Sequence, residues 1–440
     1  MQYSTFAAID IGSYDVILEI FEISKKQGIR SVDKICHRME LGKDTYTLGK
    51  IRPEMEEELC RVLADFVRIM EGYRVDDYRA TASSAISEAS NSLYVLGKIH
   101  QLTGLSVTVL SNSEQRFLSY KALAAMEDNF NKIIEKGTAI LDLDGGSFQI
   151  SLFDKDALVT TQNIRMGSLR IRERLAGIQS ETEHYEEMVE ELIWNEVSSF
   201  KKMYLKDRKI ENIMLIGDVF TDSVYQNIEE KTTKIISREN FNTWYEKIIR
   251  QSPMELAVKL GIPLENASLM YPSAVIYKCL IDMMGAEHIW IPGVHMTRGI
   301  AYEYAEQMKL LKGGHNFEND ILMAAKNIGK RYAVNRPHVQ NLEMTALAMF
   351  DATKKMHGMK ERERLLLQMA VMLHDVGKYI SFNNVADSSY NIIMSNEIIG
   401  LSHIEREMVA LIARYNTVTL PSYDELVMES SLSAEQYLTV

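Results

Sequence analysis

One short motif occurs twice in this sequence, and the repeat limits what the chain can fold into. In each copy an apolar run ends in an aspartate and a turn of glycine and serine, and a second apolar run follows. The first copy, residues 6–23, contains Asp10, Gly12 and Ser13. The second copy, residues 138–153, contains Asp142, Gly145, Gly146 and Ser147. Two strand–turn–strand units whose aspartates lie 132 positions apart predict an internal duplication of α/β halves.

A turn of this kind suggests a chemistry as well as a shape. Glycine lets backbone N–H groups approach a phosphate without steric conflict. An aspartate at the strand end can hold Mg²⁺, or a water bound to it. Two such turns facing each other across a cleft would clamp a phosphate chain beside Asp10 and Asp142. The alternative is that both are ordinary hairpin turns, each with a capping aspartate.

The overall charge argues against nucleic acid or a membrane as the partner. The 440 residues include 49 Lys and Arg against 61 Asp and Glu, a net charge of -12. Bulk electrostatics therefore do not recruit DNA, RNA or an anionic membrane. No apolar run approaches the roughly 18–20 residues of a membrane span, and the start has no signal-peptide pattern. With three widely spaced cysteines and no CxxC pair, we expect a soluble, cytoplasmic, reduced protein.

Helical patterns fill the rest of the chain. Residues 53–70 and 113–126 have helical periodicity, with Ser113 as the expected N-cap of the second helix. From Arg298 the pattern is helical almost to the end, and residues 313–316 indicate a hinge. We expect domains at residues 1–128, 129–305 and 306–440.

Further blocks make the whole chain resemble a known family. These are residues 82–91, 110–115, 166–168, 372–377 and 413–415. Together with the two turns they resemble the exopolyphosphatase / guanosine pentaphosphate phosphohydrolase (Ppx/GppA) family. The resemblance implies two actin-like α/β lobes around a cleft, as in the sugar-kinase and heat-shock-protein superfamily with its RNase H-like fold. An all-α HD-like domain would follow, and a helix near residues 298–311 would cross back to the first lobe.

The resemblance also implies a reaction and its site. Such proteins remove the terminal phosphate of polyphosphate or guanosine pentaphosphate, so the implied partners are polyphosphate or guanosine penta/tetraphosphate, with Mg²⁺ or Mn²⁺ as cofactor. The metal would lie at Asp142 and Asp10, and the turn residues that would hold phosphate are Gly12, Ser13, Gly145, Gly146 and Ser147. The family's general base aligns with Gln115, and Glu114 precedes it. A neutral amide cannot accept the proton of an attacking water, whereas Glu114 is rotated by about 100° along a helix.

Other family positions carry different chemistry here. Ser87 stands in place of a phosphate-facing arginine, Asp144 in place of a glycine, and Gln149 in place of a glutamate. In a third phosphate loop, Asp218 and Phe220 replace small residues by charge and bulk. A hydroxyl cannot replace a guanidinium, and a carboxylate repels phosphate unless a cation intervenes.

Two functions therefore remain open. One is phosphoanhydride hydrolysis, weak or lost, and the other is a non-catalytic phosphate- or nucleotide-binding or regulatory protein. If the protein is non-catalytic, the side chains of Tyr14, Asp144 and Phe220 should block the phosphate cradle. If it is an enzyme, they should point away from it. A kinase is a third reading, but the second half shows no Gly-rich adenosine-binding segment.

The helical module carries a possible metal site of its own. His338, His374 and Asp375 fit the first three ligands of metal-dependent HD phosphohydrolases, but Asn383 and Asp387 stand where further ligands would be sought. Lone histidines on helices are more often structural. By resemblance the module serves substrate channelling or a homodimer, and Met369 and Met372 are expected in its core.

Overall fold

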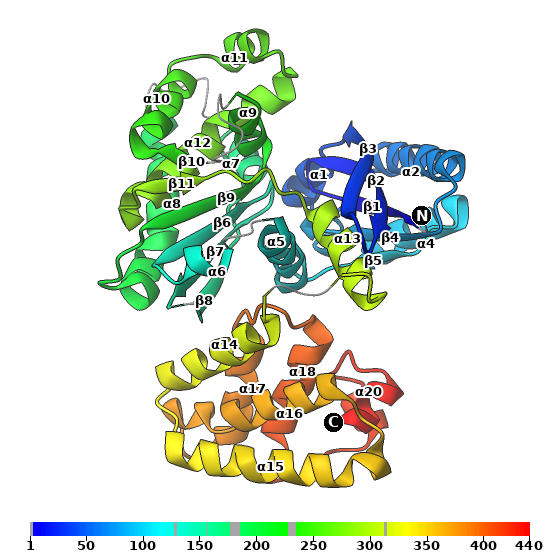
Figure 1. Ribbon diagram of the computed structural model, residues 1–440, viewed down its shortest axis with the longest axis vertical. Coiled ribbons are helices and arrows are strands. Elements are labelled where there is room, and N and C mark those ends of the chain that lie inside the picture. The colour runs from blue at the N-terminus through cyan, green and yellow to red at the C-terminus, as the bar shows by residue number, and fades with distance from the viewer. Residues whose placement is uncertain (1–2, 127–129, 156, 177–184, 228–234, 312–314) are drawn as a thin grey trace. The chain divides into compact units, whose positions relative to one another are not determined.

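The computed structural model describes residues 3–126, 130–155, 157–176, 185–227, 235–311 and 315–440. The chain divides into two units, one of residues 1–156 and 162–315 and the other of residues 157–161 and 316–440. The first unit contains two β-sheets with helices, and the second is built mainly of helices (Figure 1).

The first sheet contains the first copy of the repeated motif. Strand β1 pairs antiparallel with β2 and parallel with β4, and the strand order is β3-β2-β1-β4-β5. The strands are β1 (Ser4–Ile11), β2 (Asp15–Ser24), β3 (Gly28–Arg38), β4 (Asp77–Ala82) and β5 (Val107–Val109).

The second sheet repeats this topology around the second copy. Strand β6 pairs antiparallel with β7 and parallel with β9, and the order is β10-β11-β9-β6-β7-β8. The strands are β6 (Thr138–Leu143), β7 (Phe148–Asp154), β8 (Ala157–Ile164), β9 (Asn212–Gly217), β10 (Ile235–Ser237) and β11 (His288–Trp290). Strand for strand, β8-β7-β6-β9-β11 matches β3-β2-β1-β4-β5, which supports the predicted duplication.

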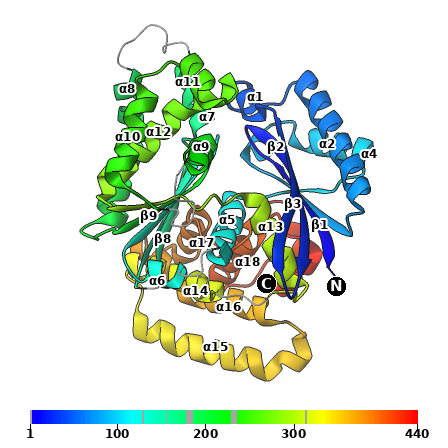
Figure 2. The same cartoon turned by 45° about the horizontal axis from the view of Figure 1, so that its top comes forward.

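Period-two alternation places the first sheet between two layers of helices. Ala7, Ile9 and Ile11 of β1 pack with residues of α2 (Pro53–Tyr73) and α4 (Ser92–Thr103). Phe6 and Ala8 point to the opposite face and pack with α13 (Met296–Gln307). Figure 2 shows α2 and α4 on one side of this sheet and α13 on the other.

The other helices of the first unit flank the two sheets. They are α1 (Leu41–Leu48), α3 (Ser84–Ser87), α5 (Asn112–Met126), α6 (Phe130–Ile134), α7 (Ser168–Leu175), α8 (Tyr185–Phe200), the π-helical turn η1 (Lys201–Leu205), α9 (Val219–Asn227), α10 (Arg238–Ile249), α11 (Pro253–Leu260) and α12 (Leu264–Met284). Helix α5 begins at Asn112, and Ser111 rather than the expected Ser113 caps it, since Ser111 Oγ accepts from Glu114 N at 3.3 Å.

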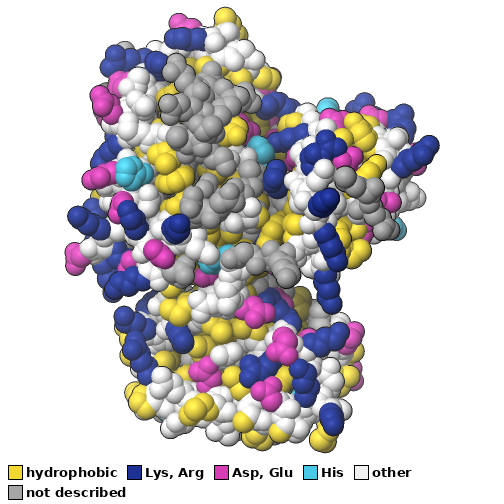
Figure 3. Space-filling model, in the orientation of Figure 1, with side chains coloured by type: hydrophobic (Ala, Val, Ile, Leu, Met, Phe, Trp, Pro, Cys, Tyr) yellow, Lys and Arg dark blue, Asp and Glu magenta, His cyan; other side chains and the backbone are white. Residues whose placement is uncertain are grey.

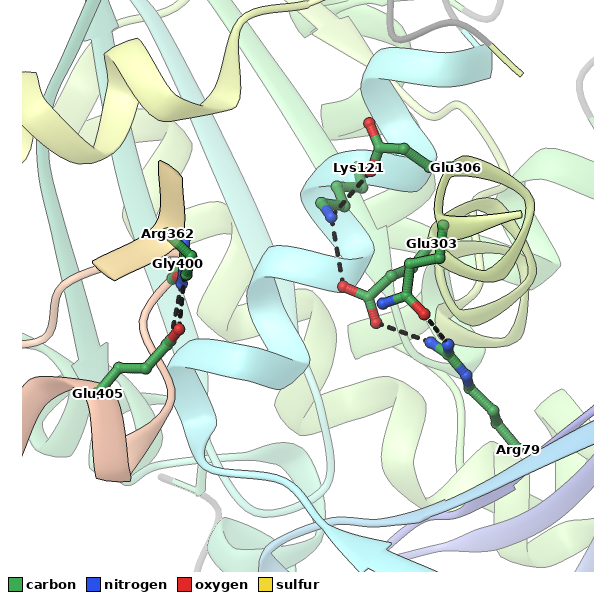
Figure 4. Close-up of polar contacts among 8 residues, drawn as sticks. Arg79, Lys121, Glu303, Glu306, Arg362, Gly400 and Glu405 are labelled. Atoms are coloured by element: carbon green, nitrogen blue, oxygen red, sulfur yellow. Dashed lines mark hydrogen bonds and ion pairs between the residues drawn. The ribbon is translucent and has the colours of Figure 1, made fainter. Parts of the chain in front are cut away.

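Helix α13 covers the first sheet although it follows the second sheet in the sequence. The rings of Phe6 and Tyr304 stack with centroids 4.1 Å apart. Glu303 accepts from Arg79 of β4 at 3.1 Å and pairs with Lys121 of α5 at 3.3 Å (Figure 4). The chain thus crosses back to the first sheet near the position that the resemblance implied.

The second unit is helical apart from residues 157–161. Its elements are α14 (Phe317–Arg331), α15 (Arg336–His357), α16 (Glu361–Leu373), the 3₁₀ turn η2 (Val376–Tyr379), α17 (Val385–Ser395), α18 (His403–Arg414), α19 (Tyr423–Leu426) and α20 (Ala434–Thr439). Met369 and Met372 are buried in it, as predicted. The second unit takes up the chain again at Asn316, and α13 belongs to the first unit.

An ion pair links two helices of this unit. Arg362 of α16 donates to both carboxylate oxygens of Glu405 of α18, at 2.6 and 2.7 Å, and to the carbonyl of Gly400 at 2.6 Å (Figure 4). The HD-like nature of this helical unit stays a prediction.

The surface shows no segregation of charge on the face drawn in Figure 3, where basic and acidic side chains are interspersed among the described residues. Within the described part of the chain, none of the helices combines the length and the apolar character that crossing a bilayer requires.

Candidate functional site

The two repeated turns are closed in the same way. Gly12 N donates to the carbonyl of Asp15 at 2.9 Å, and Asp144 N donates to the carbonyl of Ser147 at 2.9 Å. Asp10 and Asp142 are each the second-last residue of their strands. The duplicated topology therefore places two aspartates and two turns in equivalent positions.

One cavity of about 370 Å³ lies at these strand ends. Its lining includes five of the residues that the sequence predicted: Asp10, Gly12, Gln115, Asp142 and Gly145. The other four predicted site residues are not among the described residues that line this cavity: Ser13, Glu114, Gly146 and Ser147.

Ser13 and Gly146 pack against Tyr46 of α1. Ser13 Oγ lies 2.7 Å from Tyr46 Oη and 3.2 Å from Ser84 Oγ. A β-carbon added to Gly146 would collide with the Tyr46 hydroxyl. The Arg170 guanidinium lies 3.8 Å from the centroid of the Tyr46 ring. Glycine at residue 146 therefore permits close packing between the two lobes at this point.

Helix α5 separates the two candidate bases. The Glu114 carboxylate accepts hydrogen bonds from Ser111 N at 2.9 Å and Ser111 Oγ at 2.7 Å, which forms a capping box. Gln115 is buried, and its Nε2 donates to Asp144 Oδ2 at 3.3 Å. The amide thus faces the cavity, while the carboxylate of Glu114 is held at the start of its helix.

Asp144 occupies the second turn with its own side chain. Its Oδ1 accepts from Gly145 N at 2.6 Å. This backbone N–H is one of those that a phosphate cradle would offer to a ligand. Asp144 therefore lines the cavity in the way that the sequence predicted for an obstructing residue.

Asp142 is held by a buried arginine. Arg116 Nη1 lies 2.6 Å from Asp142 Oδ1, and both side chains are buried. By distance and angle the other oxygen, Asp142 Oδ2, has no hydrogen-bond partner among the described residues, although Ser119 is close enough to favour the charged form of this carboxyl. Burial raises the pKa of Asp142, and Arg116 opposes that shift.

Asp10 offers a second unpartnered oxygen. Asp10 Oδ1 is buried and has no hydrogen-bond partner within the described part of the chain. Burial, followed by the nearby charges of Asp15 and Asp144, raises the pKa of Asp10 well above its ordinary value. Buried carboxylate oxygens without donors are the ligands that a hard divalent cation prefers. The residues present therefore fit Mg²⁺ or Mn²⁺ at Asp10 and Asp142.

Asp218 lies where the second sheet meets α9. Its φ is +47°, a left-handed conformation that is uncommon for a residue other than glycine. Asp218 Oδ1 accepts from Phe220 N at 3.0 Å and Thr221 N at 3.3 Å, so it caps α9. The other carboxylate oxygen, Oδ2, is buried, and no described residue meets the distance and angle of a hydrogen bond to it. Burial raises the pKa of Asp218 to about 7, although Ser273 and the two amides favour the charged form.

Phe220 does not obstruct the cavity. It is fully buried, and its ring lies 5.9 Å from Phe241 and 5.4 Å from Tyr277. Tyr14 does line the cavity, and its hydroxyl donates to Asn266 Oδ1 at 2.6 Å. Of the three predicted obstructing residues, Tyr14 and Asp144 reach the cavity and Phe220 packs in the core.

Several lining residues were missed by the sequence interpretation. Lys34, Cys36 and Arg38 alternate along β3 and all line the cavity. Their i, i+2, i+4 spacing indicates that the three side chains share one face of the strand. Arg116 is a further missed lining residue, and it directly follows Gln115 in the sequence. Ser87 and Gln149 are outside the lining among the described residues. Gln149 Nε2 donates instead to Ser151 Oγ at 3.4 Å.

In the helical unit, the structure brings His338, His374 and Asp375 together. One ligand atom from each lies within 4.8 Å of the others. The cluster combines the start of α15 with the turn after α16.

Comparisons with known proteins agree with this architecture. The Ppx/GppA phosphatase family matches residues 20–308, and Ppx/GppA phosphatase, domain III, matches residues 322–437. The chain is 19% identical to a guanosine-5'-triphosphate,3'-diphosphate pyrophosphatase of Vibrio atlanticus, over 99% of this chain and 85% of that one. It is 21% identical to a bifunctional 3-dehydroquinate synthase/phosphatase of Fusobacterium nucleatum subsp. nucleatum, over 64% of this chain and only 44% of that protein.

Solved structures of low identity share the fold. An exopolyphosphatase from Cytophaga hutchinsonii has a TM-score of 0.61 and 17% identity, over 69% of this chain and 98% of that one. The Aquifex aeolicus member of the Ppx/GppA family has a TM-score of 0.58 and 17% identity, over 70% of this chain and 99% of that one. With two family matches that together span both units, the chain belongs to the Ppx/GppA phosphatase family.

Proposed function

We propose that this chain hydrolyses the terminal phosphoanhydride bond of polyphosphate or of guanosine penta/tetraphosphate, with Mg²⁺ or Mn²⁺ as cofactor. Family membership supports the reaction class. The similarity to a guanosine-5'-triphosphate,3'-diphosphate pyrophosphatase from Vibrio and to an exopolyphosphatase from Cytophaga supports these two substrate classes.

The observation that carries the proposal is a pair of buried carboxylate oxygens at one cavity, Asp10 Oδ1 and Asp142 Oδ2, neither of which has a hydrogen-bond partner by distance and angle among the described residues. The cavity lining is also rich in carboxylates, with Asp10, Asp15, Asp142, Asp144, Asp218 and Asp222 against Lys34, Arg38 and Arg116. A phosphate chain would be repelled there unless cations intervened. The charge of the lining thus favours binding that depends on a divalent cation.

The lining residues have separable roles in this proposal. Asp142 and Asp10 would hold the cation, which when bound neutralises phosphate charge and polarises the P–O bonds. Arg116 orients Asp142 through the 2.6 Å contact. Lys34 and Arg38 supply positive charge for phosphate oxygens.

We assign the proton acceptor to Asp218, because the residue lines the cavity and its Oδ2 has no hydrogen-bond partner by distance and angle in the described part of the chain. A carboxyl with a pKa of about 7 can accept a proton near neutral pH. In the reaction a water oxygen bonds to the terminal phosphorus as the bridging P–O bond breaks. Inorganic phosphate leaves, and the proton of the water passes to Asp218. The Gln115 amide can orient this water but cannot accept its proton.

Phosphate release tests the proposal directly. The wild type, Asp142→Ala and Asp218→Asn are assayed on polyphosphate and guanosine pentaphosphate with Mg²⁺ or Mn²⁺. We expect Asp142→Ala to abolish release, and Asp218→Asn to lower kcat by about 10²-fold or more. The control is Asp65→Asn, an exposed aspartate on α2. A silent wild type, or an Asp218→Asn variant as fast as the wild type, contradicts the proposal.

A second candidate is a non-catalytic protein that binds the same ligands. Two observations favour it, namely the amide of Gln115 at the base position and the capture of Gly145 N–H by Asp144. Calorimetry distinguishes the two functions. Binding of polyphosphate or nucleotide without phosphate release supports the second, and turnover supports the first.

We also propose that the chain forms a homodimer through the helical unit. Met344, Met349 and Met356 of α15 are 65%, 65% and 87% exposed, an apolar surface that a partner copy would cover. Light scattering tests this, and a monomer at tens of micromolar contradicts it.

A further inference from the structure

We propose that the helical unit holds a divalent transition-metal site formed by His338, His374 and Asp375, separate from the cation of the cavity in the first unit. The first observation is proximity. Ligand atoms of the three residues lie within 4.8 Å of one another, although His338 precedes the other two by a whole helical hairpin in the sequence. The imidazole centroids lie 5.5 Å apart, and His374 Nε2 lies 3.4 Å from Asp375 Oδ1.

The second observation is the orientation of His374. Its Nδ1 lies 2.7 Å from the carbonyl oxygen of Val371. A carbonyl oxygen can only accept, so Nδ1 carries the proton and the lone pair of the neutral ring lies on Nε2. Nε2 is the atom that faces Asp375. A backbone carbonyl that fixes the free nitrogen of a histidine in this way is a common outer-shell feature of metal sites.

The third observation is the rigidity of the turn that carries two of the ligands. Ser389 Oγ donates to the carbonyl of His374 at 2.8 Å and accepts from Gly377 N at 3.0 Å. A β-carbon on Gly377 would collide with the carbonyl of Val385, so glycine allows the turn to pack closely on α17. His374 and Asp375 are both buried. Two ligands are thus positioned before any ion binds.

The accessible side of the cluster is formed by His338, which is exposed on the first turn of α15. Asp375 Oδ2 already pairs with Lys378 Nζ at 2.5 Å, which leaves Oδ1 toward His374. The Lys378 side chain is 48% exposed, so it can turn toward solvent when a cation arrives. A site of three protein ligands with an exposed side leaves coordination positions for water or a small anion.

The donor set selects the ion. Two imidazole nitrogens and one carboxylate oxygen suit Zn²⁺, Mn²⁺, Fe²⁺ or Co²⁺, whereas Mg²⁺ and Ca²⁺ prefer oxygen ligands throughout. The cavity in the first unit offers carboxylates and would take Mg²⁺ or Mn²⁺. Mn²⁺ suits both donor sets, but Zn²⁺ and Co²⁺ favour the histidine cluster and Mg²⁺ favours the cavity, so these ions separate the two sites, as mutation does.

Titration of the full-length, chelator-treated protein with Co²⁺ and Zn²⁺ tests the site. Co²⁺ reports its coordination through visible absorption, a readout that does not depend on catalysis, and Zn²⁺ affinity comes from competition. The variants are His338→Ala, at an exposed residue, and His374→Asn, whose amide can still donate to the Val371 carbonyl. The controls are His403→Ala, an exposed histidine on α18, and Asp142→Asn in the cavity.

We expect about one Co²⁺ per chain with an absorption band that survives in both controls. In His338→Ala and in His374→Asn the affinity for Co²⁺ should fall further than it does when an outer-shell group is lost. Such a loss costs roughly 10–100-fold. Circular dichroism establishes that the variants are folded. Equal binding by the wild type and both site variants, or equal loss in His403→Ala, overturns the proposal. Loss of the band in Asp142→Asn would also overturn it, because the ion would then lie in the cavity.

Discussion

Replacing Asp218 by asparagine should stabilise the first unit while removing the proposed proton acceptor. Burial raises the pKa of this carboxyl from 3.8 to about 7. Because the folded-state pKa lies above the unfolded-state value, the folded chain binds the extra proton between these values. Stability therefore falls as the pH rises from about 4 to about 7.

The magnitude follows from the size of the shift. About three pKa units at ~1.4 kcal/mol each set a ceiling of about 4 kcal/mol for the cost of the charge at pH 8. Asparagine keeps an oxygen for Phe220 N and Thr221 N, and the preference of these amides for a charged acceptor is already contained in the net pKa shift. We expect Asp218→Asn to gain up to about 4 kcal/mol at pH 8, about 2 kcal/mol at pH 5, and almost nothing below pH 4.

Urea denaturation followed by tryptophan fluorescence is suited to this measurement. All three tryptophans, Trp194, Trp244 and Trp290, belong to the first unit, so the signal reports its unfolding alone.

Asp282→Asn is a control of opposite sign. Burial alone would raise the pKa of Asp282, but hydrogen bonds from Lys278 and Arg238 lower it. This variant should lose stability at pH 8 and match the wild type at low pH. If Asp218→Asn is no more stable than the wild type at pH 8, the carboxyl is not desolvated and the assignment of the proton acceptor fails.

Three further changes test other contacts of the first unit. Arg116→Met leaves the carboxylate of Asp142 buried without its partner and should cost about 3–5 kcal/mol, measured by the same fluorescence assay; a loss under about 1 kcal/mol would show that water reaches the pair. Gln115→Glu combined with Asp144→Gly replaces an amide by a base and removes the neighbouring charge, so phosphate release should rise at least tenfold above wild type; an unchanged rate would argue against a base at this position. Gly299→Ala places a β-carbon against a carbonyl oxygen of α5 and should lower the Tm of the first unit, whereas Gly72→Ala on α2 has open space and should not.

Much of the framework could be predicted from local pattern. The two hairpins followed from apolar runs that end in Asp and Gly, and residues 53–70 lie within α2 as expected. These features depend on short-range patterns and on the repeat, both of which are visible in one sequence. The return of α13 to the first sheet, in contrast, was expected only from the resemblance.

The orientation of α5 was only partly predictable. Ser111 and Glu114 have the spacing of a capping box, which already indicates that Glu114 is engaged at the start of the helix. The interpretation placed the cap at Ser113 and so left Glu114 open as a base. A stricter use of the capping pattern would have singled out Gln115 as the residue that faces the cavity.

Other site residues could not be placed from local pattern. Phe220 was expected to obstruct the cavity in a non-catalytic protein and to swing clear in an enzyme, and its direction depends on the core around Tyr277, which lies on another helix. Alternation on β3 puts Lys34 and Arg38 on one face without showing which face meets the second sheet. These positions depend on tertiary packing between segments far apart in the sequence.

The return of α13 has a consequence for how the chain is made. Phe6, Ala8 and Phe21 lie on the sheet face that α13 covers, and ribosomal synthesis delivers that helix only after the whole second sheet. Until then the nascent first lobe presents an uncovered apolar face, so it cannot mature as an independent unit. We expect the two lobes to acquire protease resistance together on the ribosome, and a chain that stops before Met296 to need a chaperone to stay in solution.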